Sequence, residues 1–255
     1  MGRIIAIANQ KGGVGKTTTA INLSACLAEA GKKVLTIDLD PQGNTTSGLG
    51  INKEELENTV YELMLDECSI KESMVKTSIP NLTVIPANVN LAGAEIELLD
   101  VKEKEYVLKN SVDYIQDDFD FIIIDCPPSL NMLTINSMTT ANTILVPIQC
   151  EYYALEGLSQ LMHTINLVQE RLNPNLEMEG VVFTMYDART NLSLQVVDNV
   201  KGNLNTTIYQ TIIPRNIRLA EAPSHGMPIT EYDPKSAGAE SYRQLAKEVI
   251  GRKDV

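Results

Sequence analysis

Residues 9–18 read NQKGGVGKTT, a glycine-rich stretch with two lysines, Lys11 and Lys16. The apolar run RIIAIA at residues 3–8 precedes this stretch, and residues 17–31 follow it with apolar side chains at helical spacing. The stretch is therefore predicted to be a loop that joins a buried strand to a helix. Two ammonium groups on one loop repel each other, so the pair of lysines indicates a bound anion.

The glycines of the loop favour phosphate as that anion. A glycine allows a positive φ and lets backbone N–H groups turn toward a ligand, and three such positions are available: Gly12, Gly13 and Gly15. The helix expected to begin near Lys16 adds its positive end, and Thr17 offers a hydroxyl suited to Mg²⁺. The usual pattern G-x-x-x-x-G-K-[ST] requires glycine at position 10, where this chain has glutamine. The loop is therefore a deviant P-loop.

Apolar runs of strand length alternate with helical patterns along most of the chain. The candidate strands are residues 3–8, 33–40, 81–87, 119–127, 143–150, 179–186 and 207–214. Further helical spacing is found at residues 55–66, 103–116 and 236–251. This alternation predicts an α/β fold with a doubly wound, mainly parallel sheet and helices on both faces. We expect one domain that spans residues 1–255.

Three acidic residues fall where predicted strands end, namely Asp38, Asp40 and Asp125. Ligands of such sheets bind beyond the carboxyl ends of the strands. Asp125 closes the apolar run FIII, and the following Cys-Pro-Pro should stop the strand. Its carboxylate is therefore predicted to hold a Mg²⁺-bound water near the phosphates, as a Walker B residue does. Asp40 lies in a turn, DPQG, that can face the γ-phosphate.

Longer stretches resemble the deviant Walker A ATPases of the ParA and MinD superfamily. The stretches are KGGVGKTT at 11–18, DLDPQGN at 38–44 and IIIDCPPSL at 122–130. Three others are similar to chromosomal ParA proteins of the Soj type: CEYYALEGLSQL at 150–161, DARTNLS at 187–193 and IPRNIRLAEAPSHG at 213–226. The resemblance covers nearly the whole chain. It implies a weak, partner-stimulated ATPase that binds ATP and Mg²⁺.

The resemblance also implies roles for particular residues. It assigns nucleotide binding to Lys11, Gly12, Gly13, Val14, Gly15, Lys16, Thr17 and Thr18, with Pro214 and Asn216 near the adenine. It implies that Thr17 binds Mg²⁺ directly and Asp125 through water, and that Asp40 orients the attacking water with support from Asp38. Lys11 would cross a dimer interface to the partner's nucleotide, while Lys16 serves its own site. The implied catalytic set is Lys11, Lys16, Asp38, Asp40 and Asp125.

The partners implied by the resemblance are a second copy of the chain, non-specific DNA and a ParB-type protein that triggers hydrolysis and release. Arg189 and Arg218 match DNA-contacting positions, and Lys235 and Arg243 are weaker candidates. Composition argues against DNA binding, because 21 basic and 33 acidic residues give a net charge of −12. A local basic patch must therefore overcome the field of the whole molecule. We expect a cytoplasmic, nucleoid-associated protein that partitions a chromosome or plasmid.

Two other functions fit parts of the sequence. A MinD-like membrane switch would expose a C-terminal amphipathic helix, but residues 239–255 have the pattern of a core-packing helix with a polar end. No apolar run reaches the roughly 18 residues that a membrane-spanning helix needs, so no stable membrane association is expected. An enzyme such as dethiobiotin synthetase would need a site for a small-molecule acceptor, and neither DARTN nor EYYALEGL suggests one.

The cysteines and histidines are expected to be structural. Four scattered cysteines form no C-x-x-C pair, so they are expected to be reduced. Cys126 directly follows Asp125, which leaves a functional thiol or a bridged metal cluster as an alternative, although the spacing typical of metal ligands is missing. His163 lies in a helical stretch and His225 in a Ser-His-Gly turn, and neither has a catalytic partner set nearby.

Overall fold

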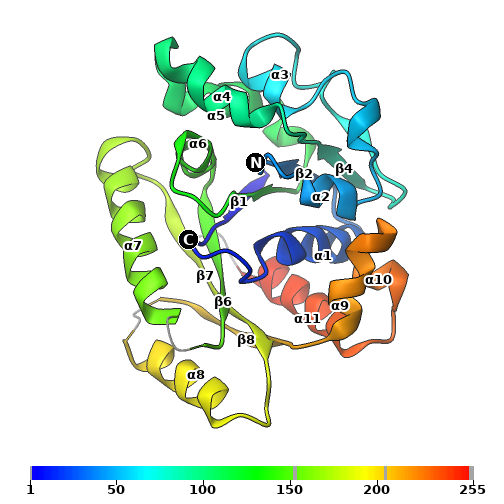
Figure 1. The fold of residues 1–255 in the computed structure, drawn as a ribbon, viewed down its shortest axis with the longest axis vertical. Helices are drawn as coiled ribbons and strands as arrows, with labels where there is room; N and C mark the ends of the chain where they lie inside the picture. Colours follow the sequence, from blue (N-terminus) through cyan, green and yellow to red (C-terminus); the bar gives the residue numbers. More distant parts are fainter. Residues whose placement is uncertain (1, 152–153, 204–205, 253–255) are drawn as a thin grey trace.

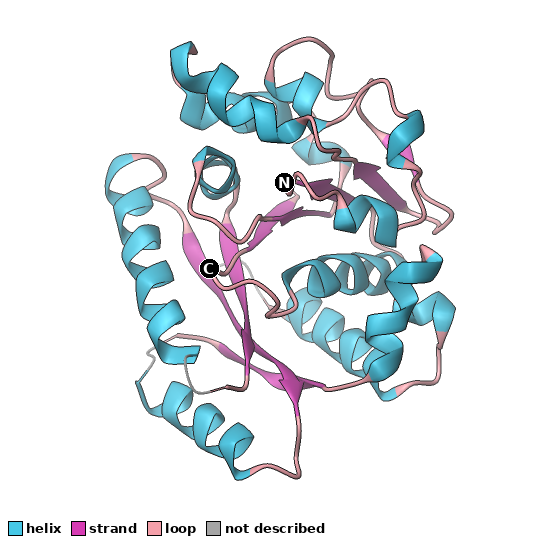
Figure 2. Ribbon diagram, viewed as in Figure 1, coloured by secondary structure: helices cyan, strands magenta, loops and turns pink. Residues whose placement is uncertain are grey.

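The computed structural model describes residues 2–151, 154–203 and 206–252, and within them eight strands form one sheet (Figures 1 and 2). Its order is β3-β4-β2-β5-β1-β6-β7-β8, and all neighbours are parallel except β3 and β4. The strands are β1 Arg3–Ile7, β2 Val34–Asp38, β3 Val75–Lys76, β4 Leu82–Ile85, β5 Phe121–Asp125, β6 Thr143–Gln149, β7 Glu177–Tyr186 and β8 Ile208–Pro214. The predicted, mainly parallel α/β sheet is confirmed. The antiparallel β3 was missed because two residues show no periodicity.

Helices cover both faces of the sheet (Figure 1). The α-helices are α1 Lys16–Glu29, α2 Asn44–Gly48, α3 Val60–Met64, α4 Leu91–Glu97, α5 Val107–Val112, α6 Met132–Thr140, α7 Ala154–Arg171, α8 Asn191–Asn203, α9 Ile217–Glu221, α10 Ile229–Tyr232 and α11 Ala237–Gly251. Single 3₁₀ turns are η1 Lys53–Glu55, η2 Leu98–Asp100, η3 Lys104–Tyr106, η4 Gln116–Asp118 and η5 Ala222–His225. Helices α1 and α11 pack together on one face, and α6 packs against α5 and α7 on the other.

Alternating side chains of the central strands pack into two separate hydrophobic cores, one on each face of the sheet. In β1, Ile4 and Ala6 belong to the core beneath α3 to α8, whereas Ile5 and Ile7 belong to the core beneath α1 and α11. Successive side chains of a strand point to opposite faces, so a strand buried on both faces is a continuous apolar run. This explains why the short run RIIAI becomes the central strand of the sheet.

Two predicted helices are shorter in the structure than in the sequence pattern. The stretch 55–66 forms an α-helix only from Val60 to Met64, because Thr59 and Glu62 form a capping box at its start. Asp66, with φ 61°, follows its end. The stretch 103–116 divides into η3, α5 and part of η4. The predicted C-terminal helix is confirmed as α11, and Tyr242, Leu245 and Val249 are buried in it.

The parallel arrangement gathers the predicted site residues at the carboxyl edge of the sheet. Ile7, the last residue of β1, is in register with Asp125 at the end of β5, and Asp38 at the end of β2 is in register with the same residue. The loop 8–15 therefore leaves the sheet directly beside both carboxylates. Among the described residues, no helix is long and apolar enough to span a membrane.

Candidate nucleotide site

The P-loop connects β1 to α1, as predicted. Gly13 and Gly15 have φ of 74° and 92°, in the left-handed region that favours glycine. The expectation of a positive φ at Gly12 is wrong, since the turn requires that conformation at the other two glycines only. A Cβ added at Gly12 would meet nothing within 4 Å in this chain. The Thr184 hydroxyl donates to the Val14 carbonyl at 2.7 Å and so anchors the loop to β7.

Lys16 is the first residue of α1, and its side chain is buried. Its ammonium donates to the Lys11 carbonyl oxygen at 3.0 Å and therefore reaches back across the loop. Burial lowers the pKa of Lys16, while the nearby Asp125 charge opposes that shift. A phosphate in the loop would stabilise the charged form of this lysine.

Asp125 is completely buried between two threonines. Thr17 and Thr45 donate to its Oδ2 at 2.8 and 2.7 Å, whereas its Oδ1 has no hydrogen-bond partner among the described residues. Burial, followed by the charge of Asp38, raises the pKa of Asp125 to about 7. An unpartnered buried carboxylate oxygen beside a threonine hydroxyl and a P-loop has the oxygen chemistry that suits Mg²⁺ or a Mg²⁺-bound water. Sequence reasoning missed Thr45, which follows the quoted DLDPQGN stretch by one position.

Asp38 and Asp40 lie in different environments. Asp38 is fully buried, and its Oδ2 accepts hydrogen bonds from the Thr46 backbone N and hydroxyl at 2.8 and 2.7 Å. Its Oδ1 accepts the Asp40 N–H at 3.2 Å, and burial raises the pKa of Asp38 to about 6. Asp40 is only partly buried, and its Oδ1 accepts the Gln42 N–H at 2.9 Å. Asp38 thus shapes the loop, while Asp40 is the carboxylate of the pair with access to water.

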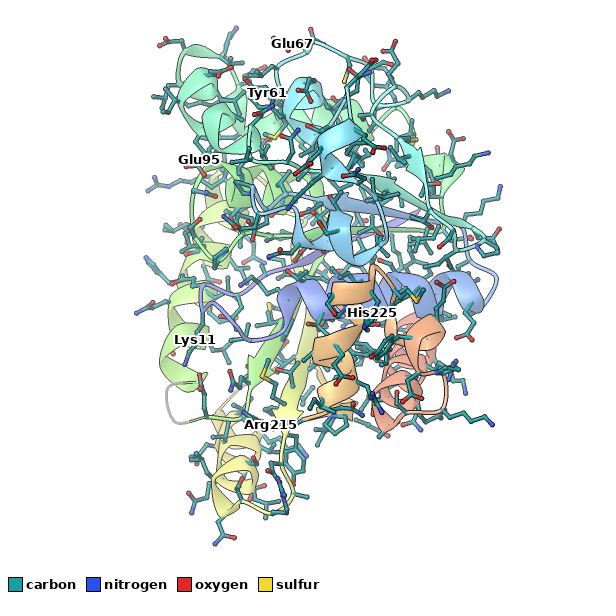
Figure 3. All side chains as sticks on the ribbon, turned by 45° about the vertical axis from the view of Figure 1, so that its right-hand side comes forward. Lys11, Tyr61, Glu67, Glu95, Arg215 and His225 are labelled. Carbon is teal, nitrogen blue, oxygen red and sulfur yellow. The ribbon has the colours of Figure 1, made fainter. Side chains whose placement is uncertain are left out.

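Lys11 forms an ion pair with Glu151, two residues after the end of β6. Each side chain is about one-third exposed, at 37% and 31%. Figure 3 shows Lys11 near the border of the molecule in that view, in agreement with its partial exposure. Glu151 was not predicted, although it lies within the quoted stretch CEYYALEGLSQL. In this conformation, Lys11 is held by a carboxylate of its own chain.

A cavity of about 490 Å³ lies beside the P-loop. Pro214 and Asn216, both predicted for this site, line it together with Gly15 and Thr18. Five further lining residues belong to the same stretch as this predicted pair: Ile213, Arg215, Ile217, Leu219 and Ala220. The others were not predicted because they are distant in sequence, namely Thr184, Met185 and Tyr242. Apolar walls that contact the P-loop suit a flat ring attached to a phosphate chain.

Comparison with known proteins assigns this geometry to a family. A family model described as an AAA domain matches residues 2–178. The sporulation initiation inhibitor protein Soj of Bacillus subtilis is 57% identical over 98% of both chains. The chromosome partitioning protein ParA of Myxococcus xanthus is 51% identical over 99% of this chain and 89% of its own. This chain belongs to the Soj/ParA family of chromosome-partitioning ATPases.

A solved structure extends the likeness to the whole fold. A Mycobacterium smegmatis protein, described as cobyrinic acid a,c-diamide synthase with bound ATP analogue and magnesium, has a TM-score of 0.87 and 40% identity. The match covers 98% of this chain and 95% of that one. The likeness therefore includes the P-loop and the sheet edge of this Soj/ParA family member.

The residues predicted to contact DNA are paired with acidic side chains. Arg189 and Arg218 are both exposed and form ion pairs with Asp187 at 2.7 Å and Glu221 at 2.9 Å. The weaker candidate Arg243 pairs with Glu29 at 2.8 Å. Lys235, the other weak candidate, is exposed on the loop before α11. Contact with DNA would require the two predicted arginines to exchange a carboxylate for a phosphate.

The cysteines are free and most of them are buried. Cys126 donates to the Ser137 hydroxyl at 3.0 Å, and burial raises its pKa to about 12. Among the described residues, no group of three or more potential metal ligands is present. His225 stacks on Tyr232 with 4.9 Å between ring centroids, and His163 is exposed on α7.

Proposed function

We propose that this protein is a Mg²⁺-dependent partitioning ATPase that binds DNA non-specifically as an ATP-bound dimer. The observation that carries the proposal is the unpartnered, buried Oδ1 of Asp125 beside Thr17 and the P-loop. Membership of the Soj/ParA family and the Mg²⁺ and ATP analogue in a 40% identical structure support the same ligands here. A ParB-type partner would stimulate hydrolysis and so release the protein from DNA.

Each part of the site has a task in this mechanism. The P-loop N–H groups and Lys16 bind the phosphates, and the apolar cavity takes the adenine. Thr17 and Asp125 would hold Mg²⁺, the latter through water, and the ion would neutralise charge on the phosphate oxygens. Asp40, which water can reach, orients the attacking water for hydrolysis. Asp38 fixes the backbone of the loop that carries Asp40.

Lys11 connects hydrolysis to dimerisation. In the single chain its ammonium pairs with Glu151. We propose that in the ATP-bound dimer Lys11 leaves this carboxylate and reaches the partner's nucleotide, where a cation stabilises charge on the transferred phosphoryl group. The bound triphosphate would thus be the switch, because it offers Lys11 a stronger anion than one carboxylate.

Co-sedimentation tests the proposal against its alternatives. Purified protein is spun with random-sequence duplex DNA or with anionic liposomes, each with Mg²⁺-ATP, Mg²⁺-ADP or no nucleotide. ATP-dependent, salt-sensitive sedimentation with DNA, lost in Lys16→Ala, is expected. Binding to liposomes alone would favour a MinD-like membrane switch. Binding to neither, with ATP turnover intact, would favour an enzyme with a small-molecule acceptor.

A further inference from the structure

The seven arginines of this acidic chain differ in their pairing. Within the part of the chain that the structure describes, five lie beside carboxylates: Arg3 and Arg252 at Glu179, Arg189 at Asp187, Arg218 at Glu221 and Arg243 at Glu29. Arg171 and Arg215 are exposed, and neither side chain has a hydrogen bond or ion pair with a described residue. With a net charge of −12, arginines without an ion pair to a described residue are the exception in this molecule.

Arg215 lies at the carboxyl edge of the sheet, at the wall of the nucleotide cavity. It directly follows β8, and its backbone N–H donates to the Tyr186 carbonyl at 2.9 Å, at the end of β7 (Figure 3). Arg171 lies at the opposite edge, because it ends α7 just before β7 begins at Glu177. The two unpaired arginines therefore differ in position while sharing exposure and charge.

The carboxylates near Arg215 form ion pairs with other arginines. Asp187 already accepts two hydrogen bonds from the Arg189 guanidinium, from Nε at 2.8 Å and from Nη2 at 2.7 Å. On the other side, Glu221 pairs with Arg218. Arg189 and Arg218 each form an ion pair with a carboxylate, whereas Arg215 forms none with a described residue and acts on Asp187 only through its charge, which helps to lower the pKa of that carboxyl group.

We propose that Arg215 binds a phosphodiester group of nucleic acid and is the principal phosphate contact at this edge of the sheet. The inference rests on the proposed DNA binding and names a residue for it. The phosphates of the nucleotide have their own site in the P-loop and at Lys16. We therefore assign the Arg215 guanidinium to a phosphate of another molecule, the nucleic acid. A guanidinium suits this task because its planar donors match two phosphate oxygens at once. Arg189 and Arg218 contribute after their carboxylates are displaced.

The test compares Arg215→Ala with Arg171→Ala, its matched control. Nucleotide affinity is measured first with a fluorescent ATP analogue, so that DNA affinity is compared at equal nucleotide occupancy. Binding to random-sequence duplex DNA is then titrated over a series of salt concentrations. Arg215→Ala should lower DNA affinity about three- to tenfold and reduce the salt slope by about one per protomer. Arg171→Ala should change affinity less than about twofold. Arg215→Lys should keep the salt slope but lose part of the affinity, because the ammonium keeps the charge and not the planar pair of donors.

Several results would overturn the inference. Equal losses in the Arg215 and Arg171 variants would show a general effect of charge. Unchanged DNA affinity of Arg215→Ala at equal occupancy, together with weaker nucleotide binding, would make Arg215 a nucleotide contact. If the wild-type protein bound no DNA with any nucleotide, the DNA-binding part of the proposed function would fail and this inference with it. Wild-type binding with an unaffected Arg215 variant would reject this inference alone.

Discussion

Asp125 is a buried carboxylate whose environment favours the protonated form more than water does. Burial and the neighbouring Asp38 raise its pKa to about 7, whereas an aspartate in an unfolded chain titrates near 3.9. A group with a raised native pKa binds its proton more tightly in the folded state. Its contribution to stability is therefore greatest below pH ~4 and is lost as pH rises toward the native pKa.

Replacing Asp125 by asparagine should remove this pH dependence. Without metal or nucleotide, the wild-type free energy of unfolding should decline relative to that of Asp125→Asn as pH rises from about 4 to about 7. Urea unfolding in a chelator at a series of pH values measures the difference. Parallel curves for the two proteins would show that Asp125 is ionised throughout. The same variant should lose Mg²⁺-dependent ATP hydrolysis.

The Lys11–Glu151 ion pair predicts a second effect at the residue scale. If the pair holds Lys11 within its own chain, Glu151→Gln should favour the ATP-bound dimer. A partly exposed ion pair contributes ~0.2–1 kcal/mol, and each dimer breaks two such pairs, so the dimer constant should rise up to about thirtyfold. Analytical ultracentrifugation with Mg²⁺-ATP measures this constant. Glu151→Gln should no longer raise the dimer constant when it is combined with Lys11→Ala. A rise that persists in the double variant would show that Glu151 does not act through Lys11.

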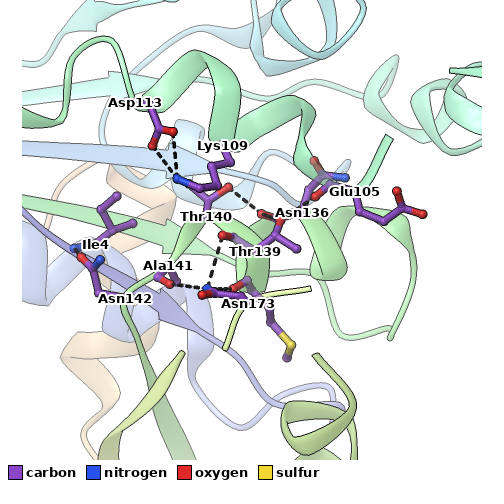
Figure 4. Close-up of polar contacts among 11 residues, drawn as sticks. Ile4, Glu105, Lys109, Asp113, Asn136, Thr139, Thr140, Ala141, Asn142 and Asn173 are labelled. Carbon is purple, nitrogen blue, oxygen red and sulfur yellow. Dashed lines mark hydrogen bonds and ion pairs between the residues drawn. The ribbon is translucent and has the colours of Figure 1, made fainter. Parts of the chain in front are cut away.

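Helix α6 shows how one side chain can end an element (Figure 4). The Asn173 amide, in the loop between α7 and β7, donates to the carbonyls of Met138 and Ala141 at 2.9 Å and of Thr139 at 3.3 Å. The last carbonyls of a helix lack partners within it. Next to this end, the Asn142 Oδ1 accepts the Ile4 N–H at 2.7 Å and ties the start of β6 to β1. Two asparagines thus position α6 against the strand that carries the P-loop.

Removing the Asn173 amide should lower the stability of the fold through this helix end. Asn173→Ala is expected to lower the free energy of unfolding by about 1–3 kcal/mol, because partly buried carbonyls lose their donor. Asn175→Ala, in the same loop but exposed and without a side-chain hydrogen bond to described residues, is the control and should change stability by less than about 0.5 kcal/mol. Equal effects of the two substitutions in chemical denaturation would contradict this role for Asn173.

At the scale of the whole molecule, the nucleotide site connects the two hydrophobic cores. The P-loop follows β1, which contributes side chains to both cores, and it continues into α1 on one face. Asp125 and Thr45 approach from β5 and α2. A ligand in this site therefore contacts elements that belong to both cores.

Nucleotide binding should consequently stabilise the entire fold. Mg²⁺-ADP at about one hundred times its dissociation constant should add about 2.7 kcal/mol to the free energy of unfolding. For a chain of this size, that corresponds to a rise in Tm of roughly 5–10 °C. Calorimetry or thermal-shift fluorescence measures it, with Lys16→Ala as the control expected to show little shift. A partial transition that leaves one core unaffected by nucleotide would contradict the connection.

The local pattern of the sequence determined the P-loop, the parallel sheet and the acidic strand ends, because each depends on neighbouring residues. Gly13, Gly15 and Lys16 specify their turn and helix start within four positions, and Asp38 and Asp125 end apolar runs. Only the tertiary structure decided which distant groups meet. Thr45 at Asp125, Glu151 at Lys11 and the acidic partners of the arginines are pairings across loops, which periodicity does not specify. Their contacts are set by the strand order of the sheet, which brings the carboxyl ends of its parallel strands to one edge.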